Sequence, residues 1–332
     1  MRMKGIYFDS ILDASGVEGF FGESDKEEEY RYRRYTGPFK PNFAGITFVS
    51  KTSTLLLNKG NAPMRSDGIT LKELFPKCIL PNFRPGNIIL SLRMFLEGFM
   101  LNAVGLSGPG FEALLEMNRW QKRTNPFMIS IMSIAKTPED RLAETREFVR
   151  LLLKHLPNFW TRFGVQKNYS CPNIGMNIDC LIDEVRADLD ILAELGMPIM
   201  PKFSVLTPAD KVKAISEHKA CDAICVSNTI PWGKLPNRID WKGLFGSDIS
   251  PLAEFGGGGL SGWPLLQLVA EWVNTARTCG IRKSICAGGG ILSRRDLRPL
   301  RNAGASSVFV GSVATLRPLR IQGIVEEARN LF

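Results

Sequence analysis

Residues 168–173 read NYSCPN and place a thiol between two amides at the point where an apolar run gives way to a turn. Pro172 has no backbone N–H and biases Cys171 away from helical angles, so the chain leaves a strand here. A thiolate is a reactive base, and the amides of Asn168 and Asn173 both donate and accept hydrogen bonds. The stretch therefore predicts a functional site, although most free cysteines are buried structural residues.

Several other apolar runs end in polar side chains or glycines, where a strand would stop. These endings are KTST (51–54), LNAVGL (101–106), PKF (201–203), SNT (227–229), AGGGI (287–291) and VGS (310–312). Loops that follow the parallel strands of an α/β barrel meet at one face of the molecule. We therefore expect these segments and NYSCPN to converge on one site.

Glycines dominate AGGGI and VGS, and each segment is followed by the start of a predicted helix. Glycine permits close approach to the backbone, and helix N-termini favour anions. In α/β barrels a phosphate frequently lies at the loops after the last two strands. Together with GGLSG (258–262), the two segments predict a cofactor phosphate site. Taken singly, each is also explained as a tight turn, and the GxGxxG dinucleotide fingerprint is missing.

The elements that must position these segments follow a repeating order from residue 127 onward: a short apolar run, a polar turn and a segment with helical spacing. The runs are FMISIMS (127–133), the run that ends in NYS (168–170), MPIMPKF (197–203), DAICVS (222–227), SICAG (284–288) and SSVFVG (306–311). Thr137 can cap the first helix, with Pro138 at its first position and Asp140 as a capping acid.

Two earlier runs, GITFVS (45–50) and FMLNAVG (99–105), bring the number of predicted strands to eight. Strands that alternate with helices form a parallel sheet, because parallel neighbours need crossover connections. We predict a closed (β/α)8 TIM barrel, with an open doubly wound sheet as the alternative. Residues 1–332 are expected to form one domain, with insertions at 18–43 and 229–262.

Composition limits the class of protein. The chain has 332 residues, 44% of them hydrophobic and 23% charged, which is typical of a globular protein. Its start, MRMKGIYFDS, lacks the apolar core of a signal peptide, and Arg93 and Glu97 interrupt the apolar stretch 88–106. We expect no membrane span. The seven cysteines are scattered without CxxC pairs, which favours a reducing cytoplasm over a disulfide framework.

A formal charge of +9 could attract nucleic acid, but the basic residues are dispersed, and the mixed run 23–34 alternates in sign. We therefore expect no nucleic-acid partner. Cys221 and Cys225 have no histidine near them in the sequence, so no metal site is predicted.

With these segments in order, the chain resembles the dihydroorotate dehydrogenase family, flavoproteins that carry FMN in a (β/α)8 barrel. The motifs that carry the resemblance are DASGV (13–17), SKTST with GNAPMR (50–65), LNAVGLSGPG (101–110), NYSCPN, PKF, SNT, GGLSG, AGGGI and VGS. They occur in the family's order over nearly the whole chain.

The resemblance implies an FMN site. Its residues would be Ala14, Ser15, Gly16, Lys51, Asn168, Lys202, Gly262, Gly289, Gly290, Gly311 and Ser312. The resemblance implies that the ribityl phosphate is held by Gly262, Gly289, Gly290, Gly311 and Ser312. It also implies that Lys202 lies beside the N1/C2 carbonyl region of the flavin, where its charge favours the reduced form.

The resemblance also implies a dihydroorotate/orotate site. Its residues would be Lys51, Asn102, Gly105, Leu106, Asn168, Asn173, Asn228 and Thr229. Four asparagines suit a dihydropyrimidine ring, whose C=O acceptors and N–H donors alternate. The catalytic residues implied are Cys171 and Lys51: the Cys171 thiolate removes a proton from C5 of dihydroorotate while hydride passes from C6 to flavin N5.

A cysteine at position 171 marks the soluble type of the family, since serine there marks the membrane-bound type. We expect a homodimer. The oxidant stays open between fumarate and a partner subunit that carries FAD and an iron-sulfur cluster. The insertion at 18–43 and the loop after Thr229, with Trp232 and Trp241, depart from the family pattern and could form a lid, a partner surface or a packed excursion.

Two alternatives to dihydroorotate oxidation are a related FMN oxidoreductase that acts on dihydrouracil or tRNA dihydrouridine, and a non-catalytic flavin-binding barrel.

Overall fold

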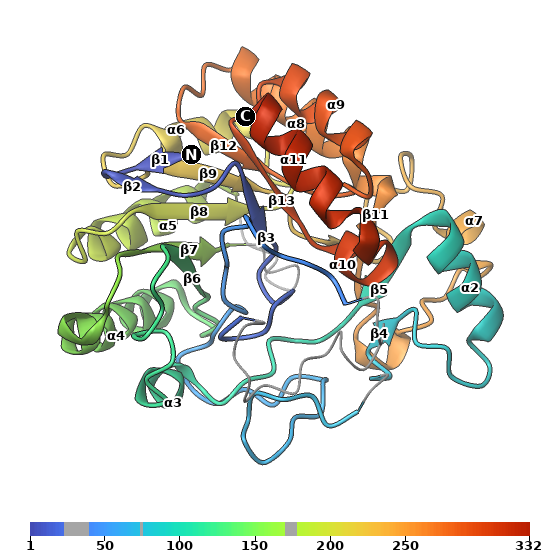
Figure 1. The fold of residues 1–332 in the computed structure, drawn as a ribbon, viewed down its shortest axis with the longest axis horizontal. Coiled ribbons are helices and arrows are strands. Elements are labelled where there is room, and N and C mark those ends of the chain that lie inside the picture. Colours follow the sequence, from blue (N-terminus) through green and yellow to red (C-terminus); the bar gives the residue numbers. More distant parts are fainter. Residues whose placement is uncertain (23–39, 74–75, 170–177) are drawn as a thin grey trace.

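A curled parallel sheet forms the centre of the molecule, and helices cover its outside (Figure 1). The computed structural model describes residues 1–22, 40–73, 76–169 and 178–332. The strand order is β3-β13-β12-β9-β8-β7-β6. Their bounds are β3 (Ile11–Asp13), β6 (Phe127–Ile131), β7 (Phe163–Asn168), β8 (Ile199–Phe203), β9 (Ala223–Val226), β12 (Ser284–Ala287) and β13 (Ser307–Val310).

Residues 47–53 close this sheet into a barrel. Thr47 forms a parallel bridge to Leu12 of β3, and Val49 forms one to Met128 of β6. The Ser50 N–H also donates to the Met128 carbonyl at 2.9 Å. The two edge strands are therefore joined through one segment, which confirms the predicted barrel over an open doubly wound sheet.

The prediction that residues 99–105 form a barrel strand is wrong. β5 (Phe99–Asn102) instead belongs to a separate antiparallel sheet with the order β10-β11-β5-β4. Its other strands are β4 (Ile79–Leu80), β10 (Ile230–Pro231) and β11 (Gly259–Gly262). Residues Ile11–Asp13 form the barrel strand instead. The prediction failed because a short buried apolar run is compatible with either sheet.

The helices pack around the barrel in chain order. The longer ones on its outside are α4 (Pro138–His155), α5 (Ile178–Ala193), α6 (Ala209–Ser216), α8 (Leu266–Thr278), α9 (Leu297–Ala303) and α11 (Ile321–Leu331). The others are α2 (Ile88–Glu97), α3 (Phe111–Glu116), α7 (Trp241–Phe245), α10 (Ser312–Leu316) and the 3-10 turns η2 (Leu156–Asn158), η3 (Ala253–Phe255), η4 (Trp263–Leu265), η5 (Arg294–Asp296) and η6 (Pro318–Arg320). The predicted cap of α4 is confirmed, since Thr137 Oγ1 accepts from the Asp140 N–H at 3.1 Å. No described helix is both long and apolar enough to cross a bilayer.

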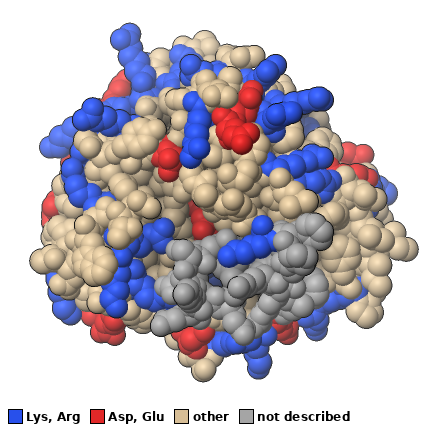
Figure 2. Space-filling view, in the orientation of Figure 1, with Lys and Arg blue, Asp and Glu red and all other residues tan. Residues whose placement is uncertain are grey.

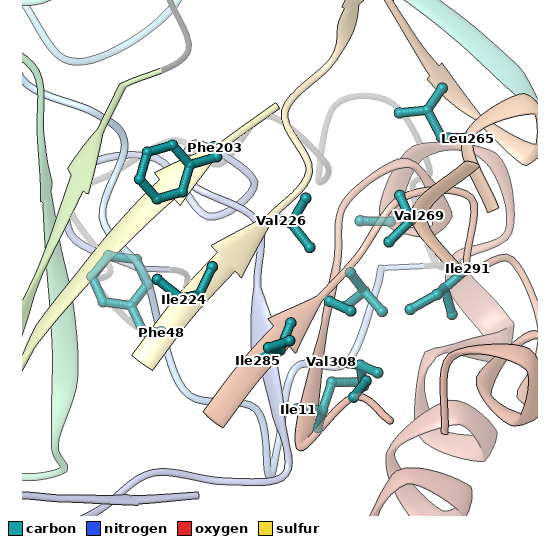
Figure 3. Packing of buried hydrophobic residues seen from close by; sticks show 14 of the residues in the cluster. Ile11, Phe48, Phe203, Ile224, Val226, Leu265, Val269, Ile285, Ile291 and Val308 are labelled. Atoms are coloured by element: carbon teal, nitrogen blue, oxygen red, sulfur yellow. The ribbon is translucent and has the colours of Figure 1, made fainter. Parts of the chain in front are cut away.

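Two buried clusters hold the strands. Outward-facing residues such as Val226, Ile285 and Val308 pack with Val269 of α8, as Figure 3 shows. The inward-facing cluster includes Cys225 and Cys286 and residues of the hairpin β1 (Arg2–Met3) and β2 (Ile6–Tyr7), whose side chains fill the barrel from below. This packing fixes the strands, so their carboxyl ends have fixed positions.

The predicted insertion 229–262 contains β10, α7, η3 and β11. Trp232 packs against Trp241 and Phe245, with ring centroids 4.8 and 4.9 Å apart. Of the other predicted insertion, 18–43, residues 23–39 lie outside the described part of the chain.

Candidate functional site

A cavity of about 870 Å³ lies at the carboxyl ends of the barrel strands, beside the antiparallel sheet. Most of the residues predicted for the site line it: Ala14, Ser15, Gly16, Lys51, Asn102, Gly105, Leu106, Asn168, Lys202, Asn228, Thr229, Gly289, Gly290, Gly311 and Ser312. The fold therefore brings segments from both ends of the chain into one hollow.

Three predicted site residues are not among those that line the cavity. Gly262 ends β11, and a side chain there would collide with the backbone of Gly98 and Phe99, so this glycine permits close packing of β11 on β5. Cys171 and Asn173 lie outside the described residues.

Two of the predicted asparagines contact each other. Asn168 ends β7 and Asn228 follows β9, and the Asn228 amide donates to Asn168 Oδ1 at 3.0 Å. The Tyr169 N–H donates to the Lys202 carbonyl at 3.0 Å, which ties the end of β7 to β8. The two amides thus share one wall of the cavity.

Two lysines approach the cavity, Lys202 from β8 and Lys51 from the segment 47–53. Lys202 is only 5% exposed, and its Nζ lies 5.0 Å from the centre of the Phe309 ring. Lys51 Nζ donates to the Ser107 carbonyl, and the Lys51 side chain lies against Gly16. These ammonium groups favour an anionic or electron-rich ligand.

Hydroxyl groups support the segment beside Lys51. Ser15 Oγ lies 2.7 Å from Thr52 Oγ1 and donates to the Ser50 carbonyl at 2.9 Å. Thr52 Oγ1 in turn lies 2.9 Å from Ser130 Oγ. This buried chain fixes Ser15 and Gly16 at the cavity wall.

The glycines after β12 and β13 give the cavity a wall of bare backbone. Gly290 has φ +83°, and a Cβ there would lie 2.9 Å from both the Gly262 carbonyl oxygen and the Leu266 nitrogen. A Cβ on Gly311 would lie 3.1 Å from Ala14 Cβ. These glycines therefore let the loops after β12 and β13 pack closely on their neighbours, and they present backbone groups to the cavity.

Sequence reasoning missed two asparagines that shape the segment 103–107. The Asn61 amide donates to the Ala103 carbonyl at 2.7 Å, and the Asn58 amide donates to the Gly105 carbonyl at 3.0 Å. Both asparagines line the cavity. Asn61 lies in the GNAPMR motif that carries the family resemblance, so that motif could have pointed to it.

These bonds turn the carbonyl groups of the segment toward protein donors. Ser107 Oγ donates to a third carbonyl of the segment, that of Val104, at 3.1 Å. Gly105 and Leu106 have φ of 69° and 60°. Among the described residues, none accepts a hydrogen bond from the N–H groups of Gly105 and Leu106. A cavity wall with carbonyls turned away and N–H groups available suits a carboxylate.

A buried polar network lies behind β7, on the side of α4 and α5. Lys167 is fully buried, donates to Ser133 Oγ at 2.6 Å and to Thr145 Oγ1 at 2.7 Å, and lies 3.5 Å from Asp188. Burial lowers the pKa of Lys167, against the opposing charge of Asp188. Burial and the charge of Asp188 raise the pKa of Tyr169, which therefore stays protonated.

Asp13, at the end of β3, is a second buried acid near the cavity. Its carboxylate accepts from the Val49 N–H, at the segment that closes the barrel. Burial and the neighbouring charge of Glu18 raise the pKa of Asp13 well above its ordinary value. The side chain therefore joins β3 to residues 47–53.

Comparison with known proteins places this site in a family context. A family model described as dihydroorotate dehydrogenase matches residues 75–329. The catalytic subunit of dihydroorotate dehydrogenase B (NAD(+)) from Endomicrobium trichonymphae is 25% identical over 305 residues, covering 88% of this chain and 91% of the relative. The same subunit from Cutibacterium acnes is 26% identical over 260 residues, covering 75% and 77%.

A solved structure shares the fold. The crystal structure of DHODH from Eimeria tenella in complex with ferulenol superposes with a TM-score of 0.63 at 18% identity, covering 99% of this chain and 82% of that one. At this identity the likeness concerns the fold alone.

Proposed function

The chain belongs to the dihydroorotate dehydrogenase family of oxidoreductases, and we propose that it oxidises dihydroorotate to orotate in pyrimidine biosynthesis with FMN as its resident cofactor. One observation carries the proposal. Residues chosen from seven separate strand exits, together with DASGV, line a single cavity at the barrel mouth. That cavity combines a bare backbone wall, two lysines and paired amides.

The residues present fit FMN. Gly289, Gly290 and Gly311 line the cavity and would offer backbone groups to its phosphate, and Ser312 would add a hydroxyl group. Lys202 supplies a buried positive charge that stabilises negative charge developing on a ligand in the cavity. Bound FMN would supply the acceptor for the hydride that leaves C6 of the substrate.

Other residues that line the cavity suit the substrate. Asn102, Asn168 and Asn228 offer amides to the ring, and Asn173 would complete the set. The N–H groups of Gly105 and Leu106 would hold the carboxylate. The amides and the backbone segment together orient C5 and C6 of the ring.

Cys171 is the proposed base that takes the proton from C5. Only the thiolate can do so, and an ordinary thiol has a pKa of about 8.5. The rate of the reductive half-reaction should therefore rise as the pH increases through the pKa of Cys171. Lys51, whose Nζ also donates to the Ser107 carbonyl, would hold the substrate side of the cavity positive.

We propose NAD(+) as the final oxidant, reached through a partner subunit. The relatives named above are catalytic subunits of an NAD(+)-dependent enzyme, and this supports the proposal. A cytoplasmic location fits the free thiols of Cys78, Cys221, Cys225, Cys279 and Cys286.

An absorbance spectrum of the purified protein, taken before and after anaerobic addition of dihydroorotate, tests the function. We expect a flavin spectrum that dihydroorotate bleaches and dihydrouracil does not. In stopped-flow experiments Cys171→Ala should slow bleaching by at least a hundredfold, while the control Cys279→Ala should match the parent. A colourless protein that FMN cannot reconstitute, bleaching by dihydrouracil alone, or a flat pH profile with Cys171 intact would contradict the proposal.

A further inference from the structure

Lys167 and Asp188 form an ion pair in the interior of the protein. Figure 2 shows Lys, Arg, Asp and Glu side chains spread over one face of the molecule, where water solvates them. The side chains of Lys167 and Asp188 are by contrast only 1% exposed. A buried ion pair usually stabilises a fold no better than well-packed apolar residues of similar volume. Stability alone therefore does not account for this pair, and its place in the barrel points to another role.

Lys167 lies on β7 between two residues that face the inside of the barrel. Successive side chains of a strand point to opposite faces of the sheet. The Gln166 amide lies 3.7 Å from Cys225 Sγ of the inward-facing cluster, and Asn168 lines the cavity. Lys167 and Tyr169 therefore point outward, toward the helices that cover the sheet. These two outward side chains flank Asn168 along the chain.

The Lys167 ammonium group joins β7 to three neighbouring elements. It donates to Ser133 Oγ, just after β6, at 2.6 Å and to Thr145 Oγ1 of α4 at 2.7 Å. Its third neighbour is the Asp188 carboxylate of α5, at 3.5 Å. An ammonium group has three N–H donors, and these three oxygen-bearing groups match that number. A shift of β7 toward or away from the cavity would break these contacts.

Tyr169 holds the chain on the other side of Asn168. Its ring stacks on that of Phe203 of β8 with the centroids 5.7 Å apart, and its N–H donates to the Lys202 carbonyl at 3.0 Å. Its buried hydroxyl group lies near Asp188, whose charge contributes to the raised pKa of Tyr169. Asn168 is thus held through both of its neighbours in the chain.

We propose that Lys167 and Asp188 are positioning residues for the reaction, because they fix the end of β7 and so hold the Asn168 amide in the orientation that binds the substrate ring. The inference rests on the proposed function and adds to it a pair that touches neither substrate nor flavin. Asn168 Oδ1 accepts from the Asn228 amide at 3.0 Å, so a tilt of β7 would also separate these two amides.

Replacing the pair by apolar residues in the FMN-loaded full chain tests the proposal. Stopped-flow bleaching by saturating dihydroorotate should slow about a hundredfold in Lys167→Met/Asp188→Leu, since a misplacement of about 1 Å can have an effect of this size. The matched control is Arg141→Met/Glu184→Leu, which removes another buried ion pair, joining α4 to α5, with residues 3% and 7% exposed. The control should keep the parental rate within about threefold, because it does not touch β7.

A double-mutant cycle with Asn168 tests whether the pair acts through this residue. Asn168→Ala should slow bleaching at least about thirtyfold in the parent and in the Arg141→Met/Glu184→Leu background. In the Lys167→Met/Asp188→Leu background it should add less than about fivefold, because the amide is already misplaced. A pair that acts only on stability would leave the full effect of Asn168→Ala in all three proteins.

Urea unfolding and flavin content show whether each variant folds. If Lys167→Met/Asp188→Leu does not fold, Thr145→Val replaces it in the test, since it removes one acceptor of Lys167 and keeps the side-chain volume. This variant should slow bleaching about threefold or more, by the loss of one hydrogen bond to a charged group.

The parent protein separates the proposed function from the positioning role. A parent flavin that dihydroorotate does not bleach would overturn the proposed function and this inference with it. If the parent is bleached, a parental rate in the folded test variant, an equal loss in the Arg141→Met/Glu184→Leu control or additive effects in the cycle would overturn the positioning role alone.

Discussion

At the scale of single residues, the site depends on side chains that set backbone direction as much as on those that touch ligands. Asn58 and Asn61 hold the carbonyls of Gly105 and Ala103, so the following N–H groups are available to the cavity. The stretch LNKGNAP reads as a polar turn, since asparagine next to glycine usually marks a turn. Asn102, Asn168 and Asn228, which line the cavity, were predicted because they follow apolar runs, whereas no such pattern marks Asn58 and Asn61 as donors to a neighbouring loop.

Replacing both asparagines should weaken binding of carboxylated ligands selectively. We expect Asn58→Leu/Asn61→Leu to raise the Kd of orotate about tenfold or more, because two hydrogen bonds of about 0.5–1.5 kcal/mol each orient the segment. The Kd of uracil, which lacks the carboxylate, should change less than twofold. Titration of the flavin spectrum measures both, with the exposed Asn42→Leu as control; equal losses for the two ligands would show that the segment does not recognise a carboxylate.

At the scale of elements, a strand ending is informative only when the sheet it belongs to is known. FMLN at 99–102 and ILD at 11–13 are both buried, and neither shows the alternation that would reveal an exposed face. The run at 99–105 was predicted as a barrel strand, whereas residues 11–13 were not predicted as a strand. The true barrel strand is set by long-range pairing with β13 and Thr47, which local pattern does not encode.

The turn after β12 should not tolerate a side chain. Gly290→Ala combines the strain of φ +83° with contacts of 2.9 Å to the Gly262 and Leu266 backbone, so it should destabilise the fold by about 2–4 kcal/mol. It should also lower FMN affinity at least tenfold. Gly233→Ala is the matched control, since its φ is +76° with nothing within 4 Å. Urea unfolding and flavin fluorescence measure the two effects; a variant with parental FMN affinity would refute the phosphate site.

Replacing one member of the buried pair Lys167 and Asp188 should lower the free energy of unfolding more than replacing both. Lys167→Met leaves Asp188 buried and unpaired, so it should destabilise the fold by about 3–5 kcal/mol. Lys167→Met/Asp188→Leu should be neutral or more stable than the parent, because both desolvation penalties disappear. Urea unfolding at neutral pH measures both; a double variant less stable than the single one would contradict this reasoning.

The same pair predicts a pH dependence. The folded pKa of Lys167 is lowered, so between that pKa and the unfolded value of about 10.4 the unfolded chain binds a proton that the folded chain has released. The parent's free energy of unfolding should therefore rise with pH across this window relative to that of the double variant. Parallel curves for the two proteins would show that Lys167 does not titrate there.

At the scale of the whole molecule, the barrel and the cavity depend on each other. Residues 14–16, 51, 202, 289–290 and 311–312 surround one cavity, although they come from opposite ends of the chain. A ligand that contacts all of them must oppose opening of the barrel. The segment 45–50 was predicted from the sequence as a barrel strand. The structure puts residues 47–53 at the closing position of the barrel, where they make isolated bridges rather than a full strand.

Removing FMN should therefore lower thermal stability. At about a hundredfold excess over its Kd a bound ligand adds about 2.7 kcal/mol, which for a protein of this size corresponds to a midpoint roughly 3–5 °C higher. Differential scanning calorimetry of the FMN-free and FMN-loaded protein measures the shift. Coincident midpoints would mean that the cofactor does not bridge the strands, and Gly290→Ala should show a much smaller shift than the parent.

The antiparallel sheet has a consequence for how the family can diversify. β10 and β11 come from one excursion of the chain; β10 pairs with β11, and β11 pairs with β5 rather than with a barrel strand. Changes in the length of residues 229–262 can reshape the entrance of the cavity while the barrel strands keep their geometry. The choice of electron acceptor can thus evolve separately from the residues that oxidise the substrate.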